Sequence, residues 1–193
     1  MMNTLAVLEP TRTRFPITVE MYHLMGEKGV FHPDDRVELI EGELFDMSPI
    51  GSLHARCVAF LTRFLTNAAG LDHIINVQNP IILNDRSEPQ PDISIVRYRS
   101  DFYKDALPEA DDVELIIEIA DTSVDFDRNV KFRKYASAGI PEAWLIDLVG
   151  ERVEVHSEPK ANGYGIVKIY QRGENAVSET ISAIDLSVND ILG

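Results

Sequence analysis

The chain has 193 residues, of which 45% are apolar, and carries a formal net charge of −14. Its length suits one domain over residues 1–193, with enough apolar residues for a core. No apolar run approaches the roughly 18 residues that cross a membrane. Because Cys57 is the single cysteine, no internal disulfide can form, which favours a reducing, cytoplasmic setting.

The acidic balance excludes a protein that coats nucleic acid in general, because such binding is driven by Lys and Arg contacts to phosphates. It does not exclude a nuclease, since a bound metal ion cancels part of the negative charge where the phosphate binds. Tight DNA binding without a metal is disfavoured.

The N-terminal part of the chain predicts an arm, a surface helix and a hairpin. Residues 1–16, broken by two prolines, are expected to form an irregular arm. Thr18 is a candidate N-cap for a helix that ends at a pair of glycines. Two short apolar runs within 36–48 flank Glu41-Gly42 and predict a hairpin. Glu38 stands out in this hairpin because both of its neighbours are apolar.

The next segment predicts a core-facing helix and two strands. Residues 52–69 have the i, i+3, i+4, i+7, i+8 apolar pattern of a helix, with His54 in its first turn. Residues 74–83 predict a strand, and a turn-rich connection follows. Pro91 and Asp92 then lead directly into the β-rich run 93–96, so Asp92 is expected to begin a strand.

The segment 113–148 has the order strand, helix, strand. An apolar run ends on Glu118, a polar turn and a stretch of helical composition follow, and a second apolar run ends on Asp147. This order predicts a βαβ unit. Burying a carboxylate is costly unless a cation or several donors meet it, so Glu118 is a better metal ligand than structural residue.

Beyond this unit, the runs 152–157 and 166–171 alternate on either side of Asn162-Gly163 and predict an additional hairpin. The tail, residues 181–192, alternates loosely and is expected to close the edge of the sheet.

Glu38, Asp92, Glu118 and Lys131 form a candidate site. Adjacent strands would bring Asp92 and Glu118 within reach of one ion, and oxygen ligands suit Mg²⁺ or Mn²⁺. Such an ion favours phosphodiester hydrolysis. A lysine on the following helix can orient the attacking water. Lys131 is the candidate, and Lys134 is its rival.

The ordered strings RVELIEGEL, PQPDISIV and ELIIEIADTSVDFDRNVKFRKYASAGIPEAWLIDL, with the histidine at position 54, resemble the restriction-endonuclease-like family within the PD-(D/E)XK nuclease superfamily. The resemblance implies an α/β fold in which helices flank a four-stranded mixed sheet. It also implies Asp92, Glu118 and Glu38 as metal ligands. Ala120 stands where the superfamily usually has its lysine, which points to a lysine relocated to Lys131.

The hypothesis is therefore a Mg²⁺- or Mn²⁺-dependent nuclease acting on DNA. His54 would contact phosphate or metal-bound water. A homodimer would bring two related sites to a duplex. One alternative is a catalytically inactive nuclease fold that serves as an interaction or regulatory protein. Another is a two-carboxylate glycosidase, which would need an aromatic-lined groove.

Overall fold

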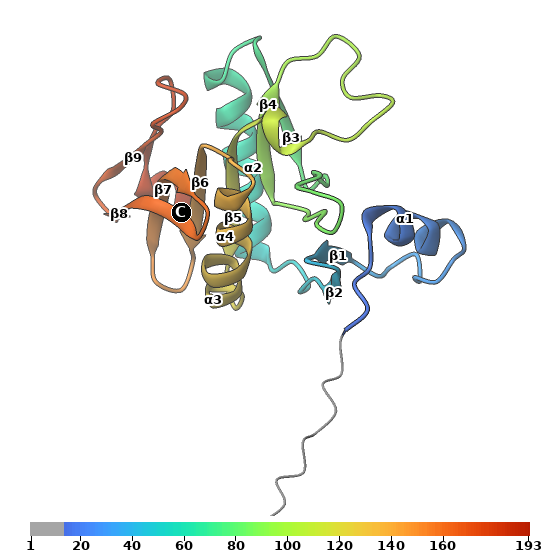
Figure 1. Cartoon of the computed structure of the whole chain (residues 1–193). Helices are drawn as coiled ribbons and strands as arrows, with labels where there is room; N and C mark the ends of the chain where they lie inside the picture. The colour runs from blue at the N-terminus through green and yellow to red at the C-terminus, as the bar shows by residue number, and fades with distance from the viewer. Residues whose placement is uncertain (1–13) are drawn as a thin grey trace, which may run out of the picture.

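A six-stranded mixed β-sheet forms the centre of the computed structural model, which describes residues 14–193 (Figure 1). The strand order is β3-β4-β5-β6-β7-β8. β5 and β6 pair in parallel, as the helical crossover between them requires, and the other neighbours pair antiparallel. These strands are β3 (His73–Val77), β4 (Ile93–Arg97), β5 (Val113–Ala120), β6 (Glu142–Asp147), β7 (Arg152–Lys160) and β8 (Gly163–Gln171).

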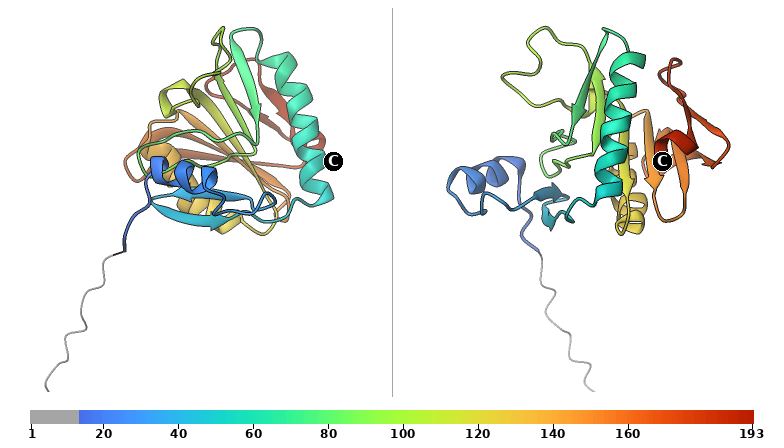
Figure 2. Two further views of the ribbon diagram at one scale, coloured as in Figure 1. Left: turned by 90° about the vertical axis from the view of Figure 1, so that its right-hand side faces the viewer. Right: turned by 180° about the vertical axis from the view of Figure 1, so that it is seen from behind.

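Helices cover both faces of the sheet. Ile93, Ile117 and Trp144 lie on the face packed against α2 (Ser52–Ala68), which Figure 2 shows running along the sheet. Ile116 and Leu145 lie on the opposite face, beneath the crossover. Because side chains alternate along a strand, this division fixes which residues share the crossover side. The crossover comprises α3 (Val124–Phe126), a π-helical turn (Asp127–Lys131) and α4 (Phe132–Ser137).

The N-terminal elements lie beside this body. The predicted hairpin is confirmed as β1 (Val37–Ile40) and β2 (Glu43–Asp46), which form their own two-stranded sheet. The turn residues Glu41 and Gly42 have φ of 53° and 79°, a conformation that glycine adopts without steric cost. The predicted surface helix is α1 (Val19–Glu27), which stands apart from the sheet and buries none of its residues (Figures 1 and 2).

One strand prediction needs correction in its length, and the predicted sheet and hairpin are present. The predicted strand 74–83 stops at Val77, because Gln78 has a φ of 51° and a proline follows at position 80. The four-stranded mixed sheet implied by the family resemblance is present as β3 to β6. The predicted additional hairpin at Asn162-Gly163 is confirmed as β7 and β8, and it extends the sheet to six strands because β7 pairs with β6.

The prediction that the tail closes the sheet edge is wrong. β10 (Asp185–Ser187) pairs with β9 (Asn175–Val177) in a separate sheet, and α5 (Val188–Leu192) follows. The buried residues Val188, Ile191 and Leu192 have helical rather than strand spacing. They pack on the α2 side of the core.

The predicted N-terminal arm lies mostly outside the described residues, and residues 14–16 have no regular structure. Within residues 14–193, no helix combines the length and apolarity that a membrane span requires.

A fully buried carboxylate anchors the segment after β9 to the sheet. Glu142, at the start of β6, is completely buried. Its Oε2 accepts hydrogen bonds from the hydroxyls of Ser178 and Thr180 at 3.0 and 2.9 Å and from the Thr180 amide at 2.8 Å. Trp144 donates its indole N–H to the other oxygen. This carboxylate is therefore stabilised by hydrogen-bond donors rather than by a cation.

We expect Glu142→Ala to lower the free energy of unfolding by about 3 kcal/mol, because several buried donors would lose their acceptor. Urea denaturation measures this change. Glu27→Ala, at the exposed end of α1, is the control and should stay within about 0.5 kcal/mol of the wild type. Similar losses in both variants would contradict the anchoring role.

Candidate active site

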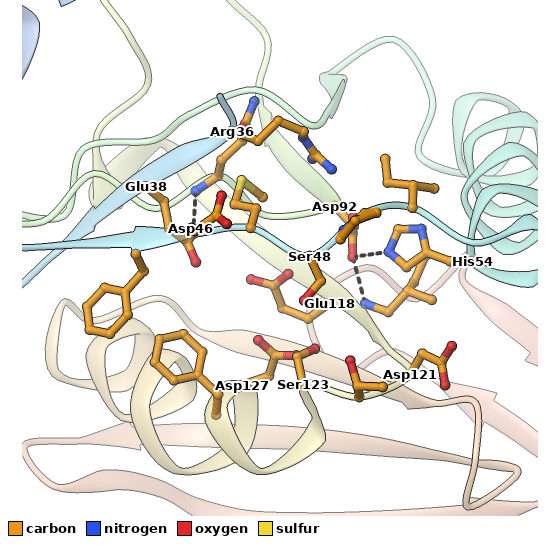
Figure 3. A pocket seen from close by; sticks show the side chains of 18 of the residues that line it. Arg36, Glu38, Asp46, Ser48, His54, Asp92, Glu118, Asp121, Ser123 and Asp127 are labelled. Carbon is orange, nitrogen blue, oxygen red and sulfur yellow. Dashed lines mark hydrogen bonds and ion pairs between the residues drawn. The ribbon is translucent and has the colours of Figure 1, made fainter. Parts of the chain in front are cut away.

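All five residues selected from the sequence line one cavity of about 550 Å³ (Figure 3). They come from five separate parts of the fold. Their sources are β1 for Glu38, α2 for His54, the residue before β4 for Asp92, β5 for Glu118 and the π-helical turn for Lys131. The chain thus brings residues up to 93 positions apart to one hollow beside the central strands.

The register of β4 and β5 places Asp92 and Glu118 side by side. Ile93 pairs with Ile117, so Asp92 lies across from Glu118. The amide of Ile119 donates to Asp92 Oδ2 at 2.9 Å. Directly opposed residues in an antiparallel pair project from the same face. Both carboxylates therefore reach the same cavity, where Figure 3 shows Asp92 bonded to His54.

The ammonium group of Lys131 lies between two carboxylates. Its Nζ is 2.7 Å from Glu118 Oε1 and 3.2 Å from Glu38 Oε2, and the residue is 4% exposed. Burial alone would lower the pKa of Lys131, but the negative charges of Glu118 and Glu38 outweigh it and raise the pKa above its usual value. Lys131 therefore stays protonated.

Lys134 lies elsewhere, with its Nζ paired to Glu41 of the hairpin turn. It does not line the cavity. The geometry thus brings Lys131, and not its rival, to the acidic pair.

A π-helical turn explains how Lys131 reaches the site. The amide of Phe132 bonds to the carbonyl of Asp127, five residues earlier. Such turns are rare and occur mostly as single bulges within α-helices, often at functional sites. The widened turn buries Asp127 and Lys131 together on the cavity side. Ser123 donates to Asp127 Oδ2 at 2.6 Å and fixes the start of the turn.

Arg128 ties the same turn to the sheet. Its guanidinium donates to both oxygens of Glu154 on β7, at 3.0 and 2.8 Å. Glu154 is 3% exposed. Burial would raise its pKa, but hydrogen bonds from His156 and Arg128, together with the charge of Arg128, lower the pKa of Glu154 to about 2. The pair therefore stays ionised and holds the turn that carries Lys131.

Glu118 is the most deeply placed carboxylate of the cavity. The Tyr135 hydroxyl donates to its Oε1 at 2.5 Å, the oxygen that also faces Lys131. Burial raises the pKa of Glu118 above its usual value, although the charge of Lys131 acts to lower it. Among residues 14–193, Oε2 accepts no hydrogen bond, so this oxygen remains available to a ligand.

Asp92 has three protein donors. Besides the Ile119 amide, His54 Nε2 lies 3.0 Å from Oδ2, and Gln78 donates to Oδ1 at 3.2 Å. Burial would raise the pKa of Asp92, but the hydrogen bonds and the nearby His54 lower it below its usual value. Asp92 therefore stays ionised. Its hydrogen bonds also link the start of β4 to β5, to α2 and to Gln78. His54 Nδ1 is buried without a hydrogen-bond partner in the described part of the chain.

Sequence reasoning missed several residues at the site. Asp127 is a further buried carboxylate of the cavity. The backbone N–H of Gln90 donates to Glu38 Oε2 at 3.1 Å. Tyr135, four residues after Lys131, donates a hydrogen bond to Glu118. The four-residue spacing of Asp127, Lys131 and Tyr135 places all three on one helical face, which was the available signal.

The carboxylate oxygens of the cavity are the type of ligand that a hard cation prefers. Asp92 and Glu118 offer carboxylate oxygens, and Mg²⁺ is usually held by one or two carboxylates, with water and phosphate oxygens completing its shell. Within residues 14–193, no group of three or more His, Cys, Asp or Glu side chains is close enough together to hold a metal ion. Glu38 interacts instead with Lys131. The arrangement thus offers a two-carboxylate site with a lysine beside it.

The fold and site define a class. A mixed α/β sheet with an acidic pair on neighbouring central strands and a lysine on the following crossover is a restriction-endonuclease-like arrangement. A solved structure of a putative nuclease belonging to DUF820 from Anabaena variabilis has the same fold, with a TM-score of 0.72 and 16% identity. The match covers 92% of this chain and 98% of that one.

The family follows from the sequence comparison. The model of the Uma2 family, described as putative restriction endonuclease, matches residues 19–189, and the chain belongs to this family. No curated protein matches the chain. The resemblance drawn from the sequence motifs is therefore confirmed.

The Arg128–Glu154 pair gives a pH-dependent prediction. We expect Arg128→Leu to lower the free energy of unfolding by roughly 2 kcal/mol at pH 7, because it leaves a buried carboxylate without its main cation. The lowered pKa of Glu154 adds stability above the unfolded value of about 4.5, and this stability is lost as pH falls towards about 2. The difference between variant and wild type should therefore shrink over that range.

Urea denaturation at a series of pH values measures this difference. Arg133→Leu, on the exposed side of α4, is the matched control. A loss that is independent of pH would mean that Arg128 contributes through packing rather than through Glu154.

Proposed function

We propose that the protein is a Mg²⁺- or Mn²⁺-dependent nuclease that hydrolyses DNA phosphodiester bonds. The observation that carries this proposal is the position of Asp92 and Glu118 on one face of neighbouring strands, with Lys131 2.7 Å from Glu118. Membership of the Uma2 family supports nuclease chemistry in general. The donor chemistry of the cavity supports the metal.

Each residue has a proposed role. Asp92 and Glu118 hold the ion, and Glu38, 3.2 Å from the Lys131 ammonium group, helps to hold that lysine beside them. When bound, the metal polarises the phosphate and makes water a better nucleophile. Lys131, kept protonated by its carboxylate neighbours, orients the attacking water and balances the charge that develops on the phosphate. His54 orients Asp92 through its Nε2, which lies 3.0 Å from Asp92 Oδ2.

A second candidate function is an inactive nuclease fold that acts as an interaction or regulatory protein. One observation favours it: Lys131 is already paired with both Glu38 and Glu118, so a cation of the protein itself lies where a metal ion would bind. Plasmid cleavage with Mg²⁺ or Mn²⁺, combined with calorimetric titration of Mn²⁺, separates the two functions. Metal binding without cleavage of any DNA or RNA would favour the inactive fold.

The glycosidase alternative cannot use the single tryptophan as its sugar-stacking residue. Trp144, the single tryptophan, is fully buried beneath α2 and donates to Glu142. It cannot stack on a sugar. A homodimer stays a prediction, and sedimentation equilibrium would test it.

We expect Asp92→Asn to abolish metal-dependent cleavage and to weaken Mn²⁺ binding at least tenfold, because a neutral amide is a poor ligand for a hard cation. The metal-free protein should lose only about 1 kcal/mol, since Asn keeps an acceptor oxygen for the Ile119 amide. Asp92→Ala would lose more, because all three donors would lack their acceptor. Nuclease assays and calorimetry measure these effects. If Asp92→Asn cleaved DNA as fast as the wild type, Asp92 would not be a metal ligand.

We expect Lys131→Ala to lose nearly all cleavage while Mn²⁺ affinity stays within about tenfold, because lysine is no ligand and its removal deletes a nearby positive charge. Lys134→Ala is the matched control, since it removes a lysine from the same helical segment but outside the cavity. Single-turnover rates on a labelled DNA measure both variants. If Lys134→Ala were the inactive variant, the role of Lys131 would be wrong.

A further inference from the structure

The cavity has an aromatic wall as well as an acidic one. Phe45 of β2 and Phe126 of α3 both line it, together with Asp92 and Glu118. Their ring centroids are 5.0 Å apart and the rings are inclined by 49°. Both side chains are half-buried, so each ring keeps part of its surface free. The hairpin and the crossover thus meet through two phenyl rings beside the acidic pair.

The aromatic pair lies on a defined side of the acidic pair. Phe45 is the cross-strand partner of Glu38, and Phe126 directly precedes Asp127. Glu38 and His54 lie on opposite sides of Asp92 in Figure 3. A molecule whose phosphate lies at the carboxylates can therefore extend towards the two rings on the Glu38 side.

The charges of the cavity oppose a long phosphate backbone. Only two cationic side chains line it within the described part of the chain, and one of them, Lys131, is already paired with two carboxylates. The other, Arg36, makes no ion pair with residues 14–193. Six carboxylates share the lining: Glu38, Asp46, Asp92, Glu118, Asp121 and Asp127.

This balance limits the kind of nucleic acid that can bind. Duplex binding draws its affinity from several Lys or Arg contacts to successive phosphates. Here neighbouring phosphates would meet the exposed Asp46 and Asp121 instead. Affinity must come from another source, and stacking of a base on an aromatic ring supplies roughly 1–3 kcal/mol without any phosphate contact.

The burial of Asp92 and Glu118 also limits the kind of nucleic acid that can bind. Asp92 and Glu118 are 8% and 4% exposed, so a phosphate must enter the cavity to reach them. A volume of about 550 Å³ lies within the range of pockets that hold a small organic ligand, and one nucleotide fits that class. A base inside a duplex must leave the stack before it can occupy such a pocket.

We propose that Phe45 and Phe126 form a base-stacking subsite, and that the substrate is an unpaired nucleotide in a single strand, a loop or a frayed end. The base packs on the two rings, Arg36 meets a flanking phosphate, and the scissile phosphate reaches Asp92 and Glu118. This inference rests on the proposed nuclease function and names its substrate class.

The test measures binding separately from cleavage. A fluorescent 12-nucleotide single strand is titrated in Ca²⁺, which supports binding, and the same oligonucleotide is titrated as a blunt duplex. We expect the wild type to prefer the single strand at least about tenfold. We expect Phe126→Leu to weaken single-strand binding about 5- to 100-fold, the range that loss of one stacked base predicts. Phe126→Tyr, which keeps the ring, should stay within about twofold.

Two controls exclude general effects. Phe102→Leu removes an aromatic side chain that is 65% exposed and outside the cavity, and it should not change binding. An oligonucleotide with abasic sites throughout should bind the wild type weakly and should be insensitive to Phe126→Leu. If Phe126→Leu fails to fold, Phe45→Leu and the abasic comparison on the wild type test the same point.

The outcomes separate the subsite from the nuclease function. Equal affinity for duplex and single strand, or equal binding by wild type and Phe126→Leu, would overturn the subsite even if the protein cuts DNA. Aromatic-dependent binding of the single strand without cleavage in Mg²⁺ or Mn²⁺ would support the subsite and overturn the nuclease function. The absence of any oligonucleotide binding would overturn the subsite.

Discussion

The buried ammonium group of Lys131 is the interaction on which the site depends. It contacts Glu118 of the central sheet and Glu38 of the separate hairpin, and it projects from the crossover. The sheet, the hairpin and the crossover thus meet at one positive charge. An unpaired charge buried at this position would be strongly destabilising, and so would two carboxylates without the lysine. This charge balance therefore acts together with the backbone hydrogen bonds between Leu39 and Glu88 to hold the hairpin at the cavity.

Lys131 lies on the crossover, and a small residue, Ala120, stands two positions after Glu118. Ala120 lies two residues beyond Glu118 on the same face of β5 and is completely buried among residues of the crossover side. A small side chain here leaves room for Phe132 and Tyr135 to pack against the sheet. The crossover therefore comes close enough to the sheet for the Lys131 ammonium group to lie 2.7 Å from Glu118 Oε1. The lysine and the small residue are thus two parts of one arrangement.

Local sequence signals predicted the elements well and the long-range contacts poorly. The hairpin at Glu41-Gly42, the helix with His54 and the strand pair around Asp92 and Glu118 follow from turn residues and apolar periodicity. The contact between Arg128 and Glu154 joins residues 26 positions apart and leaves no mark in either local pattern. The π-helical turn is similarly hidden, because its residues have an ordinary helical composition. The tail was misassigned because a few apolar residues fit strand and helix spacing equally well.

The high negative charge does not by itself locate the site. Glu142 is stabilised by amides and hydroxyls, and Glu154 by a guanidinium group, and neither lines the cavity. Asp92 and Glu118 are also buried, but they line the cavity. Within residues 14–193, Glu118 in addition keeps its Oε2 without a protein donor, where a ligand can enter. A buried charge of this kind lowers the stability of the fold, and its access to the cavity allows it to bind a ligand.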